Sequence, residues 1–252
     1  MLSEETLKVR KCLYPEYGGE RNFRQFWEKE FSELLGTEYS PEDYKDLFGS
    51  CKVKEDFEKD WERLGYSGFY RDSKAYVFHT AAYNLGTSWG MDMMKAFLRT
   101  YSGGKMLDYG GGCGNFNILA GGGVYIDRFG VFFDTAKKRF KKRKVEVDMV
   151  GASLHSVTQL NGQFDYIVCT EVLEHVEFAL ELAVYLANIL TAGGKLLLTY
   201  SFGSGDTEVM HLAKYNKSSG RVVLRLLREE GLTLIFRDFK GHIKIFEKEG
   251  RK

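Results

Sequence analysis

The sequence predicts an α/β protein, in which a doubly wound, mostly parallel sheet follows a helical region. Two patterns support this fold class. From residue 99 onward, short apolar runs alternate with segments in which apolar residues have helical spacing, as in parallel strands joined by helices. Before residue 99 only the helical spacing occurs. With 252 residues, 44% of them hydrophobic, the chain can bury one sizeable core.

Residues 1–98 form the predicted helical region, and residues 99–252 form the predicted second domain. In the first part, aromatic residues recur every four positions, which places them on one face of a helix. They are Phe23, Trp27 and Phe31 in one segment and Phe57 and Trp61 in another. Ser40 precedes Pro41, which is a favourable start for a helix. We therefore expect several helices and no strand in this region.

Seven strands are predicted in the second domain. In chain order they cover residues 105–110, 123–127, 145–150, 164–170, 195–202, 232–239 and 242–249. Helices are expected at 133–143, at 176–190 with a stop at the Ala-Gly-Gly of 192–194, and at 218–231 with a serine cap. The segment 115–122 leaves room for a short helix only. Because the last two strands follow each other directly, they suggest an antiparallel addition at one edge of the sheet.

A glycine turn follows the first predicted strand. Asp108 lies near the end of the strand, and Gly110, Gly112 and Gly114 follow it at every second position. Glycine reaches positive φ at little cost and lets the backbone approach a ligand closely. The spacing does not fit the dinucleotide fingerprint, and no Gly-Lys-Ser/Thr of a nucleotide P-loop follows. A glycine-rich turn without a ligand is the simpler alternative.

A carboxylate followed by Gly-x-Gly-x-Gly resembles motif I of the class I S-adenosylmethionine-dependent methyltransferases, and the resemblance covers roughly residues 100–250. It implies a Rossmann-like, seven-stranded sheet and S-adenosylmethionine as the cofactor. It also implies that the turn at Gly110, Gly112 and Gly114 surrounds the methionine part of the cofactor, with Asp108 close to its amino group. The helical region would then be a lid over the substrate.

A second carboxylate should accept hydrogen bonds from the ribose hydroxyls of the cofactor. Asp127 ends the second predicted strand and is our first candidate, while Asp134, seven residues later, stays a live alternative. Asp148, near the end of the third strand, is a weaker candidate for the adenine amino group. A solvated carboxylate at a strand end is an equally good interpretation of Asp148.

The fourth strand leads into Glu171-Val-Leu-Glu174-His175, which resembles the ExLEH segment of the ubiquinone-pathway O-methyltransferases and places Glu171 beside the cofactor. In a helical turn, Glu171, Glu174 and His175 share one face and are plausible ligands of Mg²⁺, Mn²⁺ or Zn²⁺. The resemblance implies a fourth ligand after the fifth strand, and His211 is the candidate. The alternative is that the segment lines the pocket and that His175, His211 or Glu174 acts in proton transfer.

Residues 137–144 include seven basic residues in eight positions. They form either a phosphate-binding stripe or the solvated face of an amphipathic helix, whose apolar edge would be Phe133, Ala136 and Phe140. The aromatic residues of 66–83 are either helix core or a clamp on a flat substrate. Within that segment, Tyr70, Tyr76 and His79 are the strongest candidates for contact with the substrate.

The overall composition narrows the class of protein. The formal net charge of +1 gives no global attraction to nucleic acid or anionic membranes. The four cysteines form no Cys-x-x-Cys pair and no apolar run is long enough for a membrane span, so we expect a cytoplasmic protein. The predicted reaction is methylation of a hydroxyl group on a small molecule. Methylation of RNA, and a cofactor-binding partner protein without catalysis, are the alternatives, and the sequence does not indicate an oligomeric state.

Overall fold

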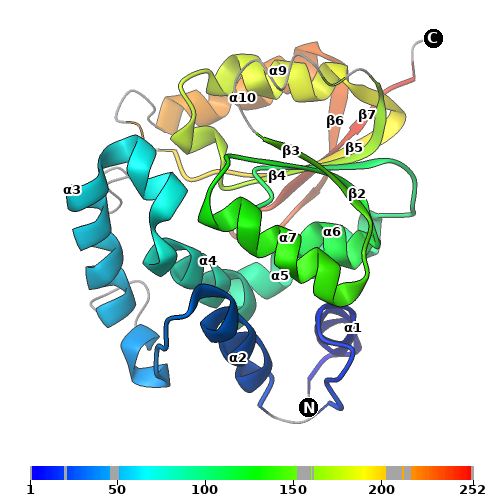
Figure 1. Cartoon of the computed structure of the whole chain (residues 1–252). Helices are drawn as coiled ribbons and strands as arrows, with labels where there is room; N and C mark the ends of the chain where they lie inside the picture. The colour runs from blue at the N-terminus through cyan, green and yellow to red at the C-terminus, as the bar shows by residue number, and fades with distance from the viewer. Residues whose placement is uncertain are drawn as a thin grey trace. The chain divides into compact units, whose positions relative to one another are not determined.

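A computed structural model describes residues 2–19, 22–45, 51–151, 160, 162–202, 212 and 217–250. Up to residue 101 the described residues form helices and connecting segments without a strand, as the sequence predicts. The helices are α1 (Glu4–Leu13), α2 (Arg24–Leu35), the short 3₁₀ helix η1 (Pro41–Tyr44), α3 (Lys52–Asp72), α4 (Lys74–Gly86) and α5 (Ser88–Thr100). Figure 1 shows them in blue and cyan.

Side-chain caps begin several of these helices. Ser3, Ser73 and Thr87 each accept a hydrogen bond from a backbone N–H in the first turn of α1, α4 and α5. At η1 the predicted cap is confirmed, because Ser40 and Asp43 form a reciprocal capping box. Within α3, Gly65 has a positive φ of 63° and divides the helix at a kink. Local sequence therefore determines where these helices begin and bend.

The remaining elements alternate between strands and helices. They are β1 (Met106–Tyr109), α6 (Asn115–Ala120), β2 (Gly123–Asp127), α7 (Val131–Arg143), β3 (Val147–Gly151), β4 (Phe164–Thr170), the 3₁₀ helix η2 (Leu173–His175), α9 (Ala179–Asn188), β5 (Leu190–Thr199), α10 (Lys217–Glu229), β6 (Leu232–Arg237) and β7 (Lys244–Lys248). All seven predicted strands are present, and α6 is short, as expected.

The strands form one sheet in the order β3-β2-β1-β4-β5-β7-β6. Strand β1 pairs in parallel with β2 and with β4, and β4 pairs in parallel with β5. Strand β7 is antiparallel to both β5 and β6. The prediction of a mostly parallel, doubly wound, Rossmann-like sheet with an antiparallel addition at one edge is confirmed.

One predicted boundary is wrong. The Ala-Gly-Gly of 192–194 does not stop α9, which already ends at Asn188, but lies inside β5. The register between β4 and β5 shifts here, because Phe164 pairs with Leu190 while Tyr166 pairs with Lys195. The extra residues form an irregularity in the strand, and Gly193, with a φ of 76°, supplies the backbone conformation that it needs.

The chain divides into two compact units by the contacts within each. The first consists of residues 1–101, 112–122 and 127–151, and in it α1 and α5 contact α6, while α2, α3 and α4 contact α7. The second consists of residues 102–111, 123–126 and 152–252, and in it α9 packs on β5 and α10 on α9 and β6. The division at residue 98 stays a prediction.

None of the helices in the described residues combines the length and the apolar character that crossing a membrane requires.

Candidate functional site

The first half of the glycine turn belongs to the second unit and is tightly packed. Asp108 is buried in β1, between Tyr125 of β2 and Val168 of β4. The backbone N–H groups of Gly110 and Gly111 both donate to the carbonyl oxygen of Ile126, at 2.8 and 3.1 Å. A Cβ at Gly110 would lie 2.4 Å from the Val172 side chain, and one at Gly111 would lie 2.6 Å from the Tyr125 ring. Close packing therefore requires both glycines.

The second half of the turn belongs to the first unit, and its two glycines differ. Gly114 has a φ of 72°, and a Cβ there would meet the ring of Phe140 in α7 at 2.5 Å. Gly112 has a φ of 52°, but the nearest atom to its Cβ position is 3.9 Å away, on Phe132. Gly114 is thus explained by packing on α7, whereas a Cβ at Gly112 would make only ordinary van der Waals contact with Phe132.

Asp127 ends β2, as predicted, and both of its carboxylate oxygens are oriented by the backbone. Its Oδ2 accepts a hydrogen bond from the Gly112 N–H at 2.7 Å, and its Oδ1 accepts one from the Arg128 N–H at 2.7 Å. Each carboxylate oxygen can accept a second hydrogen bond. The alternative, Asp134, is exposed in the first turn of α7. Asp148 is exposed as the second residue of β3, so its predicted position at the strand end is wrong.

Arg128, which sequence reasoning passed over, lies among the aromatic residues of α3. Its guanidinium carbon is 5.0 Å from the ring centroid of Tyr66 and 4.9 Å from that of Tyr70, and its Nη2 donates to the Tyr66 hydroxyl at 3.2 Å. The position directly after Asp127 was the signal that could have drawn attention to it. Tyr70 therefore contacts a residue beside the candidate ribose carboxylate.

The other two candidate aromatic positions pack within helices of the first unit. Tyr76 meets Phe132 edge to face at 5.1 Å between ring centroids, and it also contacts Phe69 at 4.8 Å. His79 stacks on Phe57 at 5.5 Å. These contacts favour the interpretation of both residues as part of the helix core.

Two carboxyl groups lie close together after β4, in the second unit. Glu171 has a positive φ of 52°, which is rare for a residue other than glycine. Its Oε2 accepts from the Ser201 hydroxyl at 2.9 Å, and Oε1 of Glu174 accepts from the Ser201 N–H at 2.8 Å. Burial, together with the charge of Glu171, raises the pKa of Glu174 well above its usual range. Ser201 was not predicted to take part.

The predicted helical geometry of residues 171–175 is wrong. Glu171 lies in the left-handed region before the turn, and Leu173–His175 is a 3₁₀ helix. With three residues per turn, Glu174 and His175 point in directions about 120° apart. Within the part of the chain that the structure describes, no three His, Cys, Asp or Glu side chains are grouped so that they could hold a metal ion. His211, the predicted fourth ligand, lies outside the described residues. The described residues alone therefore do not support a metal site at this position.

Lys244 is a further residue that the sequence did not single out. It pairs with Leu198 of β5, so it lies next to the carboxyl end of that parallel strand. Its side chain is buried, Nζ donates to the His242 carbonyl at 3.0 Å, and Nζ is 4.2 Å from the ring centroid of Tyr200. Burial, followed by the positive charge of Arg237, lowers the pKa of Lys244 to about 8.

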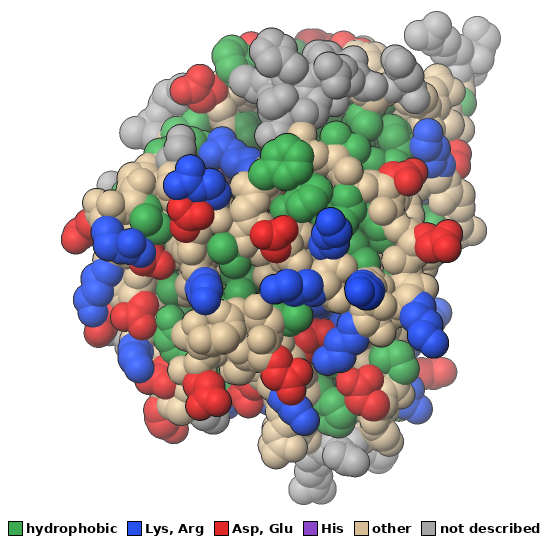
Figure 2. Space-filling model, in the orientation of Figure 1, with side chains coloured by type: hydrophobic (Ala, Val, Ile, Leu, Met, Phe, Trp, Pro, Cys, Tyr) green, Lys and Arg blue, Asp and Glu red, His purple; other side chains and the backbone are tan. Residues whose placement is uncertain are grey.

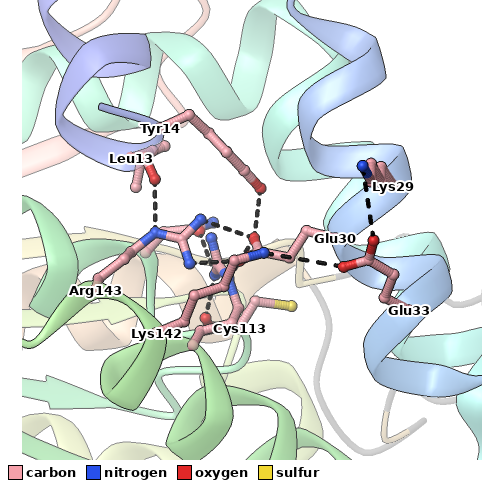
Figure 3. A network of polar contacts seen from close by, with 10 residues as sticks. Leu13, Tyr14, Lys29, Glu30, Glu33, Cys113, Lys142 and Arg143 are labelled. Carbon is pink, nitrogen blue, oxygen red and sulfur yellow. Dashed lines mark hydrogen bonds and ion pairs between the residues drawn. The ribbon is translucent and has the colours of Figure 1, made fainter. Parts of the chain in front are cut away.

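The basic run of 137–144 forms the last turns of α7 and is amphipathic. Arg139 is buried and Arg143 is largely so, and both form ion pairs with Glu30 of α2 (Figure 3). The lysines at 137, 138, 141 and 142 are exposed. On the face drawn in Figure 2, Lys and Arg side chains are interspersed with Asp and Glu. The described contacts favour the amphipathic helix over a continuous phosphate-binding stripe.

Comparison with known proteins identifies the family. Residues 83–248, more than half of the chain, match the sequence model of a family described as a methyltransferase domain. No protein with a curated description matches the chain.

Two solved structures resemble the fold. An O-methyltransferase family protein from Burkholderia thailandensis is 16% identical, with a TM-score of 0.54 over 79% of this chain and 70% of that chain. TehB from Haemophilus influenzae is 12% identical, with a TM-score of 0.52 over 67% of this chain and 65% of that chain. At such low identities the likeness concerns the fold alone.

Proposed function

Because the chain belongs to the methyltransferase-domain family and is a class I S-adenosylmethionine-dependent methyltransferase, we propose that it methylates a hydroxyl group of a small molecule. The likeness in sequence of residues 171–175 to the ubiquinone-pathway O-methyltransferases supports a hydroxyl as the acceptor. The substrate itself stays unspecified.

The backbone at Gly110, Gly112 and Gly114 binds the methionine part of the cofactor in this proposal, and Asp108 binds its amino group. Asp127 accepts hydrogen bonds from the ribose hydroxyls. The observation that carries the proposal is the 2.7 Å hydrogen bond from the Gly112 N–H to Asp127, which joins the glycine turn to the carboxylate at the end of β2. The two backbone donors hold the carboxylate in place at the end of β2.

Methyl transfer is a displacement in line with the breaking bond. Bound S-adenosylmethionine would supply an electrophilic methyl group, which the acceptor oxygen would take as the carbon–sulfur bond breaks, with S-adenosylhomocysteine as the neutral leaving group. The acceptor hydroxyl loses its proton to a base. Correct placement of the two reactants can account for much of the rate, because the step then becomes effectively unimolecular.

His175 is the described residue best suited to accept this proton, since it is the last residue of η2, shortly after the carboxyl end of β4, and is only half-buried. Glu174 is less suited, because its raised pKa favours a protonated carboxyl that holds no free base. We assign Glu174 and Glu171 to holding Ser201 in place after β5. His211 stays a prediction outside the described residues, and no step of the proposal uses a metal ion.

RNA is a less well supported acceptor. The two arginines of the basic run are directed to Glu30, and only its lysines are exposed. An RNA substrate would be bound with a steep salt dependence. A small-molecule acceptor needs no such surface.

The test compares two carboxylates that the sequence left as alternatives. We expect Asp127→Asn to weaken the binding of S-adenosylhomocysteine about tenfold or more, because a charged acceptor is lost. Asp134→Asn, exposed on α7, should leave binding unchanged. Calorimetric titration measures both, and equal affinity for all three proteins would refute the assignment of Asp127.

The acceptor class is tested with methyl-labelled S-adenosylmethionine and a cell extract separated into RNA and small molecules. Label in a small-molecule ether supports the proposal. Label confined to RNA, or binding of the cofactor without any labelled product, contradicts it.

A further inference from the structure

We propose that a buried series of charged contacts, running from Glu30 through Arg139 to the backbone of Cys113, positions the glycine turn for cofactor binding. The inference rests on the cofactor site proposed above and adds to it a role for the N-terminal helices. Every residue in this series belongs to the first compact unit. Arg139 acts here as a positioning residue, since it contacts the turn and not the reacting atoms.

Within the N-terminal helices, Glu30 is the residue that binds the arginines of α7. Its side chain, in α2, is 1% exposed, and its Oε2 accepts hydrogen bonds from the Tyr14 hydroxyl at 2.7 Å and from Arg143 Nη2 at 2.9 Å (Figure 3). Arg139 Nε donates to the same oxygen at 3.1 Å, and the Arg139 side chain is fully buried. Arg143 Nε also donates to the carbonyl oxygen of Leu13, the last residue of α1, at 2.6 Å.

The other end of the Arg139 guanidinium reaches the glycine turn. Its Nη1 donates to the carbonyl oxygen of Cys113 and to the side-chain oxygen of Asn115, the latter at 2.8 Å. In a trans peptide the carbonyl and the next N–H point in opposite directions. Because Arg139 holds the carbonyl of Cys113, it also directs the N–H of Gly114 away from α7. The orientation of the turn thus depends on where Glu30 holds Arg139.

The buried charges of this series are better explained by positioning of the glycine turn than by stabilisation of the fold. Buried ion pairs seldom stabilise a fold more than apolar side chains of the same size, because both charges lose their hydration. Arg139 Nη2 is buried, and none of the residues described in the structure accepts a hydrogen bond from it, which adds to this cost. A guanidinium offers several donors in one rigid plane, so it can relate the carboxylate of α2 to the backbone of the turn at a fixed angle.

The experiment measures the affinity for S-adenosylhomocysteine together with the melting temperature of each full-length variant. Arg139→Lys and Glu30→Gln should each raise the Kd at least tenfold. Glu33→Gln, on the same helix but exposed, should keep the Kd within twofold of the wild type. Leu85→Ala, a buried position in α4 that has no part in the series, should lower the melting temperature and leave the Kd unchanged.

A second measurement reports on the turn itself. The Cys113 side chain is buried, and burial raises the pKa of its thiol to about 12, so the wild type should react slowly with iodoacetamide. Peptide mass spectrometry should find faster alkylation of Cys113 in Arg139→Lys, slowed again by S-adenosylhomocysteine. A merely structural loss, as in Leu85→Ala, should not change the rate at temperatures far below melting.

The outcomes separate the two proposals. Folded Arg139→Lys and Glu30→Gln with wild-type affinity and wild-type alkylation of Cys113 overturn the positioning role, even if Asp127→Asn still weakens binding. If Asp127→Asn has no effect either, the proposed cofactor site fails with it. Should Arg139→Lys not fold, Glu30→Gln keeps the shape of the side chain and decides the question.

Discussion

At the scale of single residues, glycine occurs at four positions of the turn, and the physical reason for it differs among these positions. Gly110, Gly111 and Gly114 each lie against a neighbouring side chain at distances that no Cβ tolerates. Gly112 alone among these four would place a Cβ at ordinary van der Waals distance from its neighbour, 3.9 Å from Phe132. The pattern in the sequence therefore combines three glycines that close packing requires with one that packing does not require.

This difference predicts that two alanine substitutions affect stability and ligand binding to different extents. Gly114→Ala should lower the free energy of unfolding by about 2–4 kcal/mol, because its Cβ meets Phe140 and its φ is positive. Gly112→Ala should cost only about 1–2 kcal/mol from its φ, yet weaken the binding of S-adenosylhomocysteine more strongly. Urea unfolding and calorimetry measure the two effects, and an unaltered affinity in Gly112→Ala would contradict a ligand at this position.

Lys244 predicts a pH dependence of stability. Its pKa, about 8 in the folded protein, lies below the value near 10.5 of the unfolded chain. The unfolded state therefore binds more protons between these values, so the free energy of unfolding rises with pH, by about 2 kcal/mol from pH 7 to pH 9.5. Lys244→Met should lose this increase while keeping the dependence that other groups cause. Urea titrations of the wild type and of Lys244→Met at the two pH values measure this difference. An equal increase in the free energy of unfolding of both proteins would contradict the prediction.

At the scale of elements, the basic residues of α7 lie in two different surroundings. Its arginines lie on the buried face with Phe140, and its lysines lie on the exposed face. The spacing of Arg139 and Arg143, four residues apart, brings both side chains to Glu30. A run of basic residues in sequence thus divides into a structural face and a solvated face.

The ion pairs of α2 and α7 predict sensitivity to acid. Burial opposes ionisation of Glu30, but the charge of Arg139 and the hydrogen bond from Arg143 outweigh it and lower the pKa to about 2. The stabilisation is complete above pH 4.5, the value in the unfolded chain, and is lost as the pH falls toward 2, at about 3 kcal/mol in all. Glu30→Gln should reduce the slope of stability against pH between 5 and 3. Identical slopes in acid denaturation followed by circular dichroism would refute this.

At the scale of the whole molecule, the helices α1 to α5 share their compact unit with α6, α7 and β3. The contacts of α2, α3 and α4 with α7 cover side chains that would otherwise be exposed, among them Arg139. A second domain that began at residue 99 would lack these partners. The N-terminal helices therefore have a structural role in addition to the predicted one as a lid.

A fragment of residues 99–252 tests this view. We expect it to unfold without a cooperative transition and not to bind S-adenosylhomocysteine, because removal of the N-terminal helices exposes the apolar face of α7 and takes Glu30 away from Arg139. Scanning calorimetry of the fragment beside the full chain gives the answer. A cooperative transition together with cofactor binding would show that the predicted division is an independent folding boundary.

The sequence by itself determined the order of strands and helices, the short α6, the position of Asp127 at the end of β2 and the family. These features depend on local periodicity and on residues close together in the chain, where pattern and structure are directly related. It misplaced the end of α9, because the irregular start of β5 depends on pairing with β4.

Only the tertiary structure decided which residues meet across long stretches of chain. Glu30 and Arg139 are 109 positions apart, and Glu171 and Ser201 are 30 apart. No periodicity links such pairs, since their contact follows from the packing of whole elements. The turn of 171–175 likewise took a 3₁₀ form with Glu171 in a left-handed conformation, held by Thr199 of the neighbouring strand, so the expected shared face was not formed.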